Sequence, residues 1–471
     1  MSVNARKTRL EPNPTTEEPN NQTPTLGTPQ PELGWWTVKS GVKLPVKVAA
    51  LRRKLYLKAK QEPKFRFYAL YDRIYRRDVL AAAWWILLAK DKSPGVDGVT
   101  CQDIMNAPGG AARYLEDLHE SLRTKTYRPD RVKRTYLEKA DGRKRPLGIP
   151  TMRDRIVQTA AVLVLESIFE ADFLDTSYGY RPGRKPQDAI QAIQGYLQQG
   201  FREVYDADLK GYFDTIPHDK LMLALKMRIA DRAVLNLIQM WLDCEIVEVD
   251  DDGKRHITRS HRGTPQGGVI SPLLSNVYLH WFEVAFHRPS GPAHFAKAKI
   301  VRYADDFVVL ARYQGQRLQD WLGQTLEGRF ELTINREKTK VVNLNQPSAS
   351  FDFLGYTFRY DRDLKGRSHR YLNIFPSRKA MAKARDRIRE LTRSQRCFMP
   401  ADEMIAEINK WQRGWTNYFR YGYPRAAFRA IHAFTVEKLT THLQRRSQRA
   451  YRPPAGKSFY AHVHDLGLRR P

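Results

Sequence analysis

The sequence predicts an α+β protein, because short apolar runs of strand character lie between longer segments with helical periodicity. The plainest strand pair spans residues 301–310, where two apolar runs flank adjacent carboxylates at a bend. Helical spacing of apolar side chains marks residues 52–89 near the start of the chain and 377–449 near its end. With 471 residues, 42% of them hydrophobic, the chain can bury more than one core.

The other elements follow from turn and capping signals. Residues 9–34 are rich in Pro, Thr, Asn, Gln and Glu, so we expect them to be flexible. Pro-Gly and Asp-Gly pairs predict a loop at 93–98, and residues 133–149 read as a hairpin turning at Ala140-Asp141-Gly142. Helices are expected at 155–169, 186–197, from 271 onward and at 316–330, then a strand at 351–356 and helices at 377–392, 401–421 and 425–449.

The carboxylates at the bend predict a metal site. Asp305 and Asp306 repel each other when both are ionised away from bulk water, and a cation between them relieves that repulsion. A third carboxylate, Asp208, follows an apolar strand-like run upstream. Carboxylate oxygens suit Mg²⁺, and two such ions would support phosphoryl transfer.

The alternative is that these acids decorate a solvated turn. Residues 249–254 offer a comparison, because three acids there precede Gly253 and look solvated. At Asp305 no Gly or Asn relieves the turn, and apolar strand residues flank it on both sides. The metal site is therefore favoured.

The block Tyr303-Ala304-Asp305-Asp306, with Asp208 upstream, resembles the catalytic motifs of reverse transcriptases. Further blocks narrow the resemblance to the reverse transcriptases of group II introns, from about residue 50 onward. They are SPGVDGVT at 93–100, RPLGIP at 145–150, SYGYRPGR at 177–184, GTPQGGVISPLLSN at 263–276, FLGY at 353–356 and GWTNYF at 414–419.

The resemblance implies a right-hand polymerase with fingers, a palm on an antiparallel sheet, and a helical thumb and maturase domain. No zinc-containing H-N-H endonuclease is expected after Pro471, since the chain has neither the room nor the cysteines. The expected division is a flexible segment at 1–45, a helical N-terminal extension at 46–127, fingers with part of the palm at 128–205, the catalytic palm at 206–360 and the thumb and maturase domain at 361–471.

The resemblance also assigns roles to single residues. Asp208 and Asp305 would ligate Mg²⁺, and Asp306 would assist the site. Lys139 and Arg145, which flank the tip of the predicted hairpin, would bind the deoxynucleoside triphosphate, with Arg143 and Lys144 as competitors.

Three more residues are assigned in the same way. Phe213 would exclude ribonucleotides by its bulk, Gln266 would contact the incoming nucleotide or the template, and Lys338 would protonate or neutralise pyrophosphate. Each has a plainer alternative, respectively a core side chain, loop stabilisation and a surface lysine. Asp206 and Asp214 do not align with the metal-binding motif.

The net charge of +29 indicates a polyanionic partner. Residues 361–471 hold 25 lysine and arginine residues against 9 aspartate and glutamate residues, a net +16. Aromatic residues interleave with these charges and can either stack on bases or build a core. The residues expected to contact nucleic acid are Arg181, Arg184, Arg413, Trp415, Tyr418, Arg445 and Arg446.

Together these features predict an RNA-directed DNA polymerase that binds group II intron RNA, assists its splicing and copies it at a nicked DNA target. The alternatives are a domesticated relative in defence, repair or a CRISPR-linked role, and a pure RNA-binding splicing factor. No apolar stretch could span a bilayer and no secretory signal is present, so we expect a cytoplasmic protein, nucleoid-associated when it acts on DNA.

Overall fold

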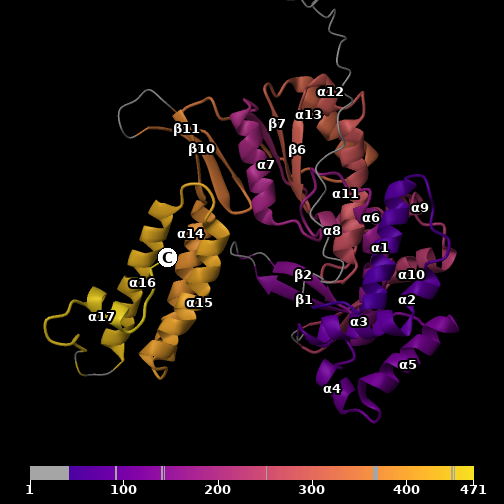
Figure 1. The fold of residues 1–471 in the computed structure, drawn as a ribbon, viewed down its shortest axis with the longest axis horizontal. Helices are drawn as coiled ribbons and strands as arrows, with labels where there is room; N and C mark the ends of the chain where they lie inside the picture. The colour runs from indigo at the N-terminus through magenta and orange to yellow at the C-terminus, as the bar shows by residue number, and fades with distance from the viewer. Residues whose placement is uncertain are drawn as a thin grey trace, which may run out of the picture.

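The computed structural model describes residues 42–90, 93–138, 142, 144–250, 252–363, 370–446, 449 and 451–470. The flexible stretch expected at 9–34 lies outside these residues, as do Lys139, Arg143 and most of the hairpin turn. Figure 1 shows the described chain as three groups of elements: N-terminal helices, a central region of sheets and helices, and a C-terminal helical unit.

The N-terminal helices pack on the central helix α6 (Met152–Glu170), nearly all of which is buried. Apolar residues at helical spacing, such as Leu80 and Trp84, face this core, as the sequence predicted. The helices are α1 (Val46–Gln61), α2 (Tyr71–Ile74), α3 (Arg77–Leu88), α4 (Cys101–Asn106) and α5 (Gly110–Arg123).

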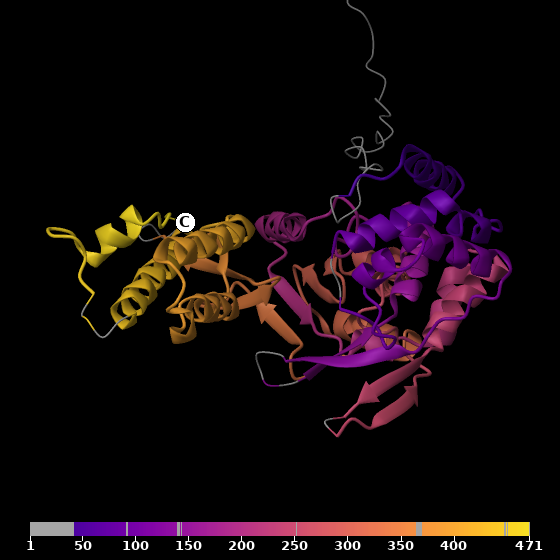
Figure 2. The ribbon, with the colours of Figure 1, turned by 90° about the horizontal axis from the view of Figure 1, so that it is seen from below.

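A four-stranded sheet follows, in the order β2-β1-β4-β5. The predicted hairpin is confirmed as β1 (Val132–Glu138) and β2 (Lys144–Ile149), paired antiparallel. Strands β4 (Glu245–Val249) and β5 (Arg255–Arg259) form a second hairpin, and β4 joins β1 in parallel. The second hairpin projects from the body of the molecule (Figure 2). Segments about 100 residues apart in the sequence thus share one sheet.

The central sheet has the order β6-β7-β3-β8, with antiparallel neighbours throughout. Its strands are β3 (Glu203–Ala207), β6 (Lys299–Tyr303), β7 (Asp306–Ala311) and β8 (Lys340–Asn343). Side chains alternate between two cores. Phe307 and Val309 join the core around α11 (Ser271–His287), whereas Val308 and Leu310 join the core around α7 (Pro186–Gln198). The sheet is therefore covered on both faces, which explains its apolar strands.

The remaining elements of this region are short or irregular. They are α8 (Tyr212–Thr215), α9 (His218–Lys226), α10 (Arg232–Leu242), α12 (Pro292–Phe295) and α13 (Gln316–Gly323). The helix predicted at 316–330 continues beyond α13 as one π-helical segment, η1 (Gln324–Arg329).

A three-stranded sheet leads into the C-terminal unit. The single strand predicted at 351–356 is wrong, because Leu354, at a positive φ of 49°, and Gly355 turn the chain between two strands. These are β9 (Ser350–Phe353) and β10 (Tyr356–Arg362), followed by β11 (Arg370–Pro376).

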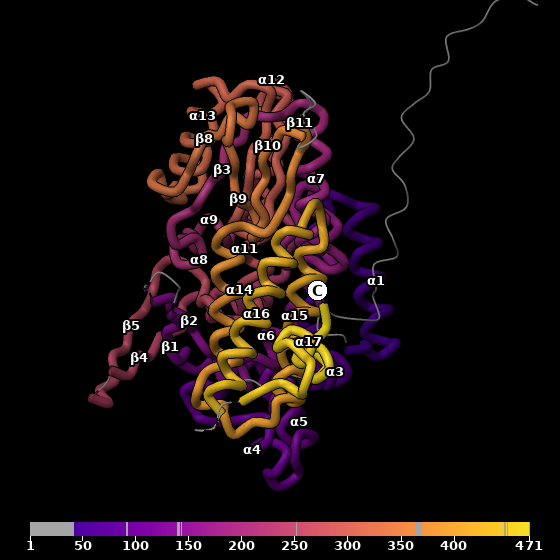
Figure 3. The backbone as a smooth tube through the Cα atoms, turned by 90° about the vertical axis from the view of Figure 1, so that its left-hand side faces the viewer, coloured from indigo at the N-terminus to yellow at the C-terminus, as the bar shows by residue number. Residues whose placement is uncertain are grey.

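The C-terminal unit contains the three predicted helices, which lie side by side in Figure 3. They are α14 (Arg378–Leu391), α15 (Ala401–Phe419) and α16 (Arg425–Arg445). A 3₁₀ turn, η2 (Ser394–Arg396), and a short helix, α17 (Phe459–Asp465), complete it. In the part of the chain that is described, no helix is both long and apolar enough to cross a membrane.

Candidate active site

The two adjacent carboxylates lie at the tight turn between β6 and β7. Tyr303 pairs with Asp306 across the hairpin, so Ala304 and Asp305 alone form the turn. Ala304 adopts a positive φ of 60°, an uncommon conformation for a residue with a side chain. Nothing in its sequence neighbourhood relieves this strain, which marks the turn as functionally constrained.

Asp208 reaches the same place from β3. Because β3 pairs antiparallel with β7, with Ala207 opposite Phe307, the residue that follows β3 lies beside the one that begins β7. Asp208, Asp305 and Asp306 all line one cleft of about 920 Å³. The structure therefore brings together the three carboxylates that the sequence singled out.

The electrostatics of the cleft favour a bound cation. Desolvation, and after it the charges of Asp305 and Asp208, raise the pKa of Asp306 to about 7. Desolvation also raises the pKa of Asp305. The surface of Asp306 remains open to solvent, so an ion can reach it. A cleft that disfavours the charges of Asp305 and Asp306 and presents hard carboxylate oxygens suits a divalent metal ion.

Positive and amide groups already contact one member of this set. Asp208 Oδ2 accepts a hydrogen bond of 2.8 Å from Asn335 Nδ2 and lies 3.3 Å from Lys338 Nζ. Among the described residues, no three carboxylate, imidazole or thiol groups are close enough together to hold a metal as they stand. Binding an ion would thus require these side chains to shift, with Asp208 exchanging Lys338 for the ion.

The residues predicted to bind the nucleotide line the same cleft, apart from Lys139, which lies outside the described residues. Arg145, at the start of β2, donates a hydrogen bond of 2.9 Å from Nε to Gln266 Oε1. Gln266 Nε2 in turn donates to Asp214 Oδ2 at 3.1 Å. Asp214 is a residue that sequence reasoning set aside, and its signal, one acid six residues after Asp208, was too weak to separate it from a surface aspartate.

Phe213 and Tyr180 form an aromatic wall of the cleft. Phe213 is 5% exposed, and its ring makes an edge contact with Tyr180 at 6.4 Å between centroids. Tyr180 lines the cleft with a positive φ of 58° and is 40% exposed. Tyr180 belongs to the block at 177–184, but nothing in the sequence alone distinguishes it from the other residues of that block.

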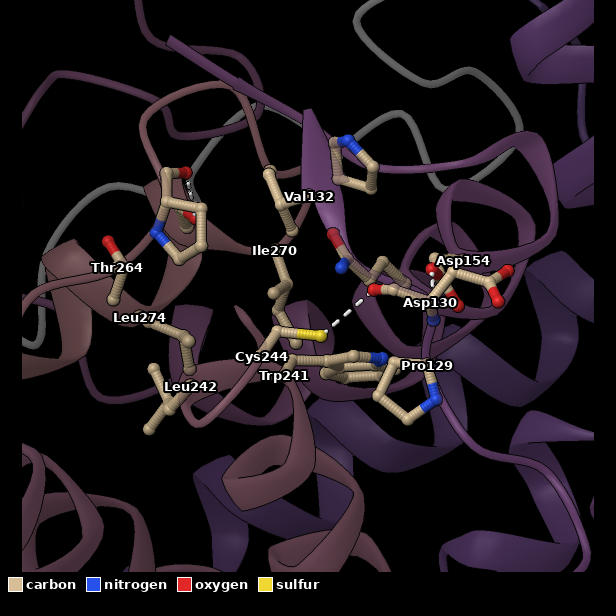
Figure 4. Close-up of a pocket in the computed structure, with 15 residues that line it drawn as sticks. Pro129, Asp130, Val132, Asp154, Trp241, Leu242, Cys244, Thr264, Ile270 and Leu274 are labelled. Carbon is tan, nitrogen blue, oxygen red and sulfur yellow. Dashed lines mark hydrogen bonds between the residues drawn. The ribbon is translucent and has the colours of Figure 1, made fainter. Parts of the chain in front are cut away.

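The loop that carries Gln266 is held by strand β2 of the neighbouring hairpin. Gly148 N on β2 donates to the Gln266 carbonyl at 2.5 Å, which ties the loop to the hairpin. Beneath lies an enclosed cavity of about 10 Å³ lined by Asp154, Trp241, Cys244 and Thr264 among others (Figure 4). A space of this size holds at most one water molecule, so it is too small to bind a substrate. The residues that line it pack tightly under the loop.

The prediction that Arg181 binds nucleic acid is wrong. Its side chain is 2% exposed, with Nη2 2.7 Å from Glu170 Oε1 and Nη1 donating to the backbone carbonyl of Ser177. A buried arginine with these partners cannot reach a phosphate without breaking the fold. Arg184 is also paired, with Asp175 at 2.5 Å, and its guanidinium lies over the Tyr178 ring.

The residues of the C-terminal unit divide into two kinds. Arg413, Arg445 and Arg446 are exposed, as contact with nucleic acid requires. Trp415 and Tyr418 are partly buried instead and pack where α15 meets the β9–β11 sheet, with Tyr418 Oη donating to the Leu354 carbonyl at 2.9 Å. Trp415 still lines a groove of about 460 Å³ together with Lys379 and Lys383.

Comparison with known families agrees with this geometry. Residues 137–358 match the family described as "Reverse transcriptase (RNA-dependent DNA polymerase)". Residues 381–459 match the "Group II intron, maturase-specific domain". The first match contains all three carboxylates and the second contains most of the helical C-terminal unit.

The chain is also similar in sequence to individual proteins. The chain is 33% identical over 368 residues to protein YkfC of Escherichia coli K12, covering 71% of this chain and 93% of that protein. It is 30% identical to the group II intron-encoded protein LtrA of Lactococcus lactis, covering 63% of this chain but only 57% of LtrA. The chain therefore spans little more than half the length of that relative.

Likeness to solved structures is weaker. A structure of apo telomerase from Candida tropicalis, truncated from its C-terminal domain, matches 53% of this chain and 59% of its own at 12% identity and a TM-score of 0.37. A likeness of this size supports no inference about function.

Proposed function

The chain belongs to the family of group II intron reverse transcriptases that carry a maturase domain, and on that premise we propose that it copies intron RNA into DNA from a nicked target site. Membership makes it an RNA-directed DNA polymerase that depends on a divalent metal. The observation that supports the proposal is that three carboxylates line one cleft together with Arg145, Phe213, Gln266 and Lys338.

We assign the metal site to Asp208, Asp305 and Asp306, and the metal to a pair of Mg²⁺ ions. When bound, such ions activate a hydroxyl and neutralise a pyrophosphate leaving group. The carboxylates themselves supply the negative charge that attracts the ions, and Asp208 gives up its contact with Lys338 to do so.

The other residues of the cleft position the deoxynucleoside triphosphate. Arg145 is exposed at the cleft and, with Lys139 beyond the described part of the hairpin, offers positive charge to the phosphates. Gln266, held by Arg145 and Asp214, presents its amide to the nucleotide or template. Phe213 blocks the 2′ side of the sugar, so that a ribose hydroxyl would clash with its ring.

The reaction then consists of one displacement. The 3′ oxygen of the primer strand bonds to the α-phosphorus, the bond from that phosphorus to the pyrophosphate oxygen breaks, and the hydroxyl proton leaves to solvent. Lys338, which is close to Asp208 at the cleft rim, stands where it can give a proton to or pair with the departing pyrophosphate.

Intron RNA is the partner we propose for the C-terminal unit. Its exposed arginines, Arg413, Arg445 and Arg446, lie on a segment with a net charge of +16. Such a surface binds phosphates through counterion release, so binding should weaken steeply as salt rises. Through this contact the protein would stabilise the folded RNA and assist its splicing.

Primer extension on an RNA template, with Mg²⁺ and deoxynucleotides, tests the proposal. Wild type should extend the primer, whereas the double variant Asp305→Ala, Asp306→Ala should bind the template RNA equally well without extending it. If neither protein extends while both bind RNA tightly, the polymerase assignment fails and the splicing-factor alternative replaces it. Sequencing the RNA that co-purifies with wild type separates an intron from a domesticated role.

A further inference from the structure

Directly behind the catalytic turn lies a fully buried ion pair. Arg302, on β6, and Glu283, on α11, both have no exposed side-chain surface, and Arg302 Nη2 lies 2.7 Å from Glu283 Oε2. Glu283 Oε1 accepts a second hydrogen bond, from Thr176 Oγ1 at 2.9 Å. Neither residue lines the cleft, so neither can touch substrate.

The guanidinium of Arg302 bonds to the turn itself. Nη1 donates 2.9 Å to the carbonyl of Ala304, the residue with the positive φ, and 2.9 Å to Asn276 Oδ1. Nη2 also donates 2.6 Å to Ser177 Oγ. One side chain thus joins the turn, helix α11 and the segment that precedes Gly179.

The turn is also held from its outer side. Asn276 Nδ2 donates 2.8 Å to the carbonyl of Gly179, and a Cβ added at Gly179 would come within 2.2 Å of Ala304 N. The backbone of Tyr178 pairs with that of Arg302 at 2.8 Å. Ala304 is therefore confined between the Gly179 backbone and the Arg302 guanidinium, and this confinement is what keeps its strained conformation.

Stability alone does not account for such a pair. Two buried charges lose their hydration, and apolar side chains of similar volume often replace a buried ion pair without loss of stability. Arg302 Nε has no hydrogen-bond partner, a further cost. An interaction that is unfavourable to bury yet bonds to a strained turn fits a role in function.

We propose that Arg302 and Glu283 are positioning residues that hold the Ala304–Asp305 turn so that its carboxylates face the cleft. The proposal deepens the assignment of the metal site and rests on it. Helix α11, which bears Glu283 and Asn276, begins directly after the loop that carries Gln266. The same helix therefore fixes the position of the Ala304–Asp305 turn relative to the loop that carries Gln266.

The test replaces the pair by apolar residues of similar size, Arg302→Met with Glu283→Leu. Its control is a second ion pair that does not touch the turn, Arg52 on α1 with Glu166 on α6, 2.8 Å apart and 5% and 20% exposed, changed to Arg52→Met with Glu166→Leu. Thermal unfolding, Mn²⁺ binding in the absence of nucleic acid, and kcat and KM for primer extension are measured for both.

The expected result is that both double variants fold but melt below wild type, because each leaves buried carbonyl groups without their donor. The turn variant alone should lose about 100-fold in kcat, with KM for nucleotide little changed, as a displacement near 1 Å predicts. Its Mn²⁺ affinity should fall about tenfold, because metal sites are this sensitive to what orients their ligands. The control variant should keep wild-type metal affinity and rate.

Wild-type Mn²⁺ affinity and rate in a stable turn variant would overturn the proposal. If that variant does not fold, Ser177→Ala decides, since it removes only the 2.6 Å bond to Arg302 and should lower Mn²⁺ affinity and kcat together. An unchanged Ser177→Ala protein would then overturn it. Loss of Mn²⁺ affinity beside a wild type that never extends primers would sink the polymerase assignment and leave the positioning role intact.

Discussion

Two hairpin turns in this protein carry closely spaced aspartates, and their surroundings are opposite. The turn between β6 and β7 holds Asp305 and Asp306 in a cleft, where desolvation raises the pKa of both. The turn between β4 and β5 holds Asp250 at the surface, where hydrogen bonds from His256 and from the Lys254 backbone lower its pKa. At the β6–β7 turn the carboxylates repel each other, and a metal ion can relieve this repulsion. At the β4–β5 turn the charge of Asp250 is already stabilised by its hydrogen bonds.

The two turns differ in the surroundings of their acids rather than in the spacing of those acids along the chain. The β4–β5 turn relaxes through Gly253, with a φ of +80° and nothing within 4 Å of an added Cβ. The β6–β7 turn has no glycine of its own, and it fits only because Gly179, which packs against Ala304, has no side chain. Buried neighbours therefore hold the β6–β7 turn in its strained, charge-repelling arrangement. The β4–β5 turn needs no such neighbours.

Lengthening one acid in each turn should show the largest contrast. We expect Asp305→Glu to lower kcat for primer extension by about 100-fold or more, because the carboxylate moves by more than 1 Å while its charge is kept. Asp250→Glu should extend primers like wild type. Equal loss in both variants would mean that the β4–β5 hairpin also contributes to catalysis.

Adding a methyl group beside each turn should have the next largest effect. Gly179→Ala places a Cβ 2.2 Å from Ala304 N, so we expect a destabilisation of about 1–3 kcal/mol from overpacking. The displaced turn should also lower kcat at least about tenfold. Gly253→Ala adds only backbone strain, so calorimetry should show a loss of stability of about 1–2 kcal/mol. Its rate of primer extension should be unchanged. A Gly179→Ala enzyme of full activity would show that the turn has room to move.

A smaller effect is expected for the lysines near each turn. Lys338→Gln should lower kcat by about tenfold at saturating metal, less than the roughly 100-fold or more that a general acid usually contributes, because water can replace its half-exposed side chain. Lys254→Gln is the control and should leave single-turnover extension unchanged. If Lys338→Gln matches it, the lysine serves only as a counter-charge to Asp208 before metal binds.

The smallest effect concerns acid stability. Since the folded-state pKa of Asp250 is lowered, its ionised form stabilises the protein above the ordinary pKa of 3.8, and that contribution is lost as the pH falls through the lowered value. Wild type should therefore melt slightly above Asp250→Asn at about pH 6, with the gap closing toward about pH 3. A gap that widened in acid would contradict the assigned direction.

Local pattern sufficed to predict the β6–β7 hairpin and its acids. The two apolar runs around Asp305 predicted the hairpin, and the ordered motif blocks singled out Asp208 and the loop of Gln266, which the structure brings to the same cleft. Periodicity also located the helices of the C-terminal unit to within a few residues. These features depend on residues that are neighbours in the sequence.

What the sequence missed depends on contacts between distant segments. Arg181 looked like a basic residue of the SYGYRPGR block at 177–184, and only the position of α6 shows that Glu170 pairs with it. The parallel pairing of β1 with β4 and the bond from Gln266 to Asp214 are equally non-local. No local signal distinguishes a buried arginine from one that reaches solvent when both lie in a polar segment.

The order of the central sheet has a consequence for how the protein is made. Strand β3 ends at Ala207, but its partner β7 is complete only at Ala311, and β8 only at Asn343. At ribosomal speeds of about 5–20 residues per second, the nascent chain waits roughly 5–20 s with β3 unpaired. During that interval Val204 and Tyr205 are open to misassociation. A chaperone that bound β3 during this interval would protect the growing chain when it is most vulnerable.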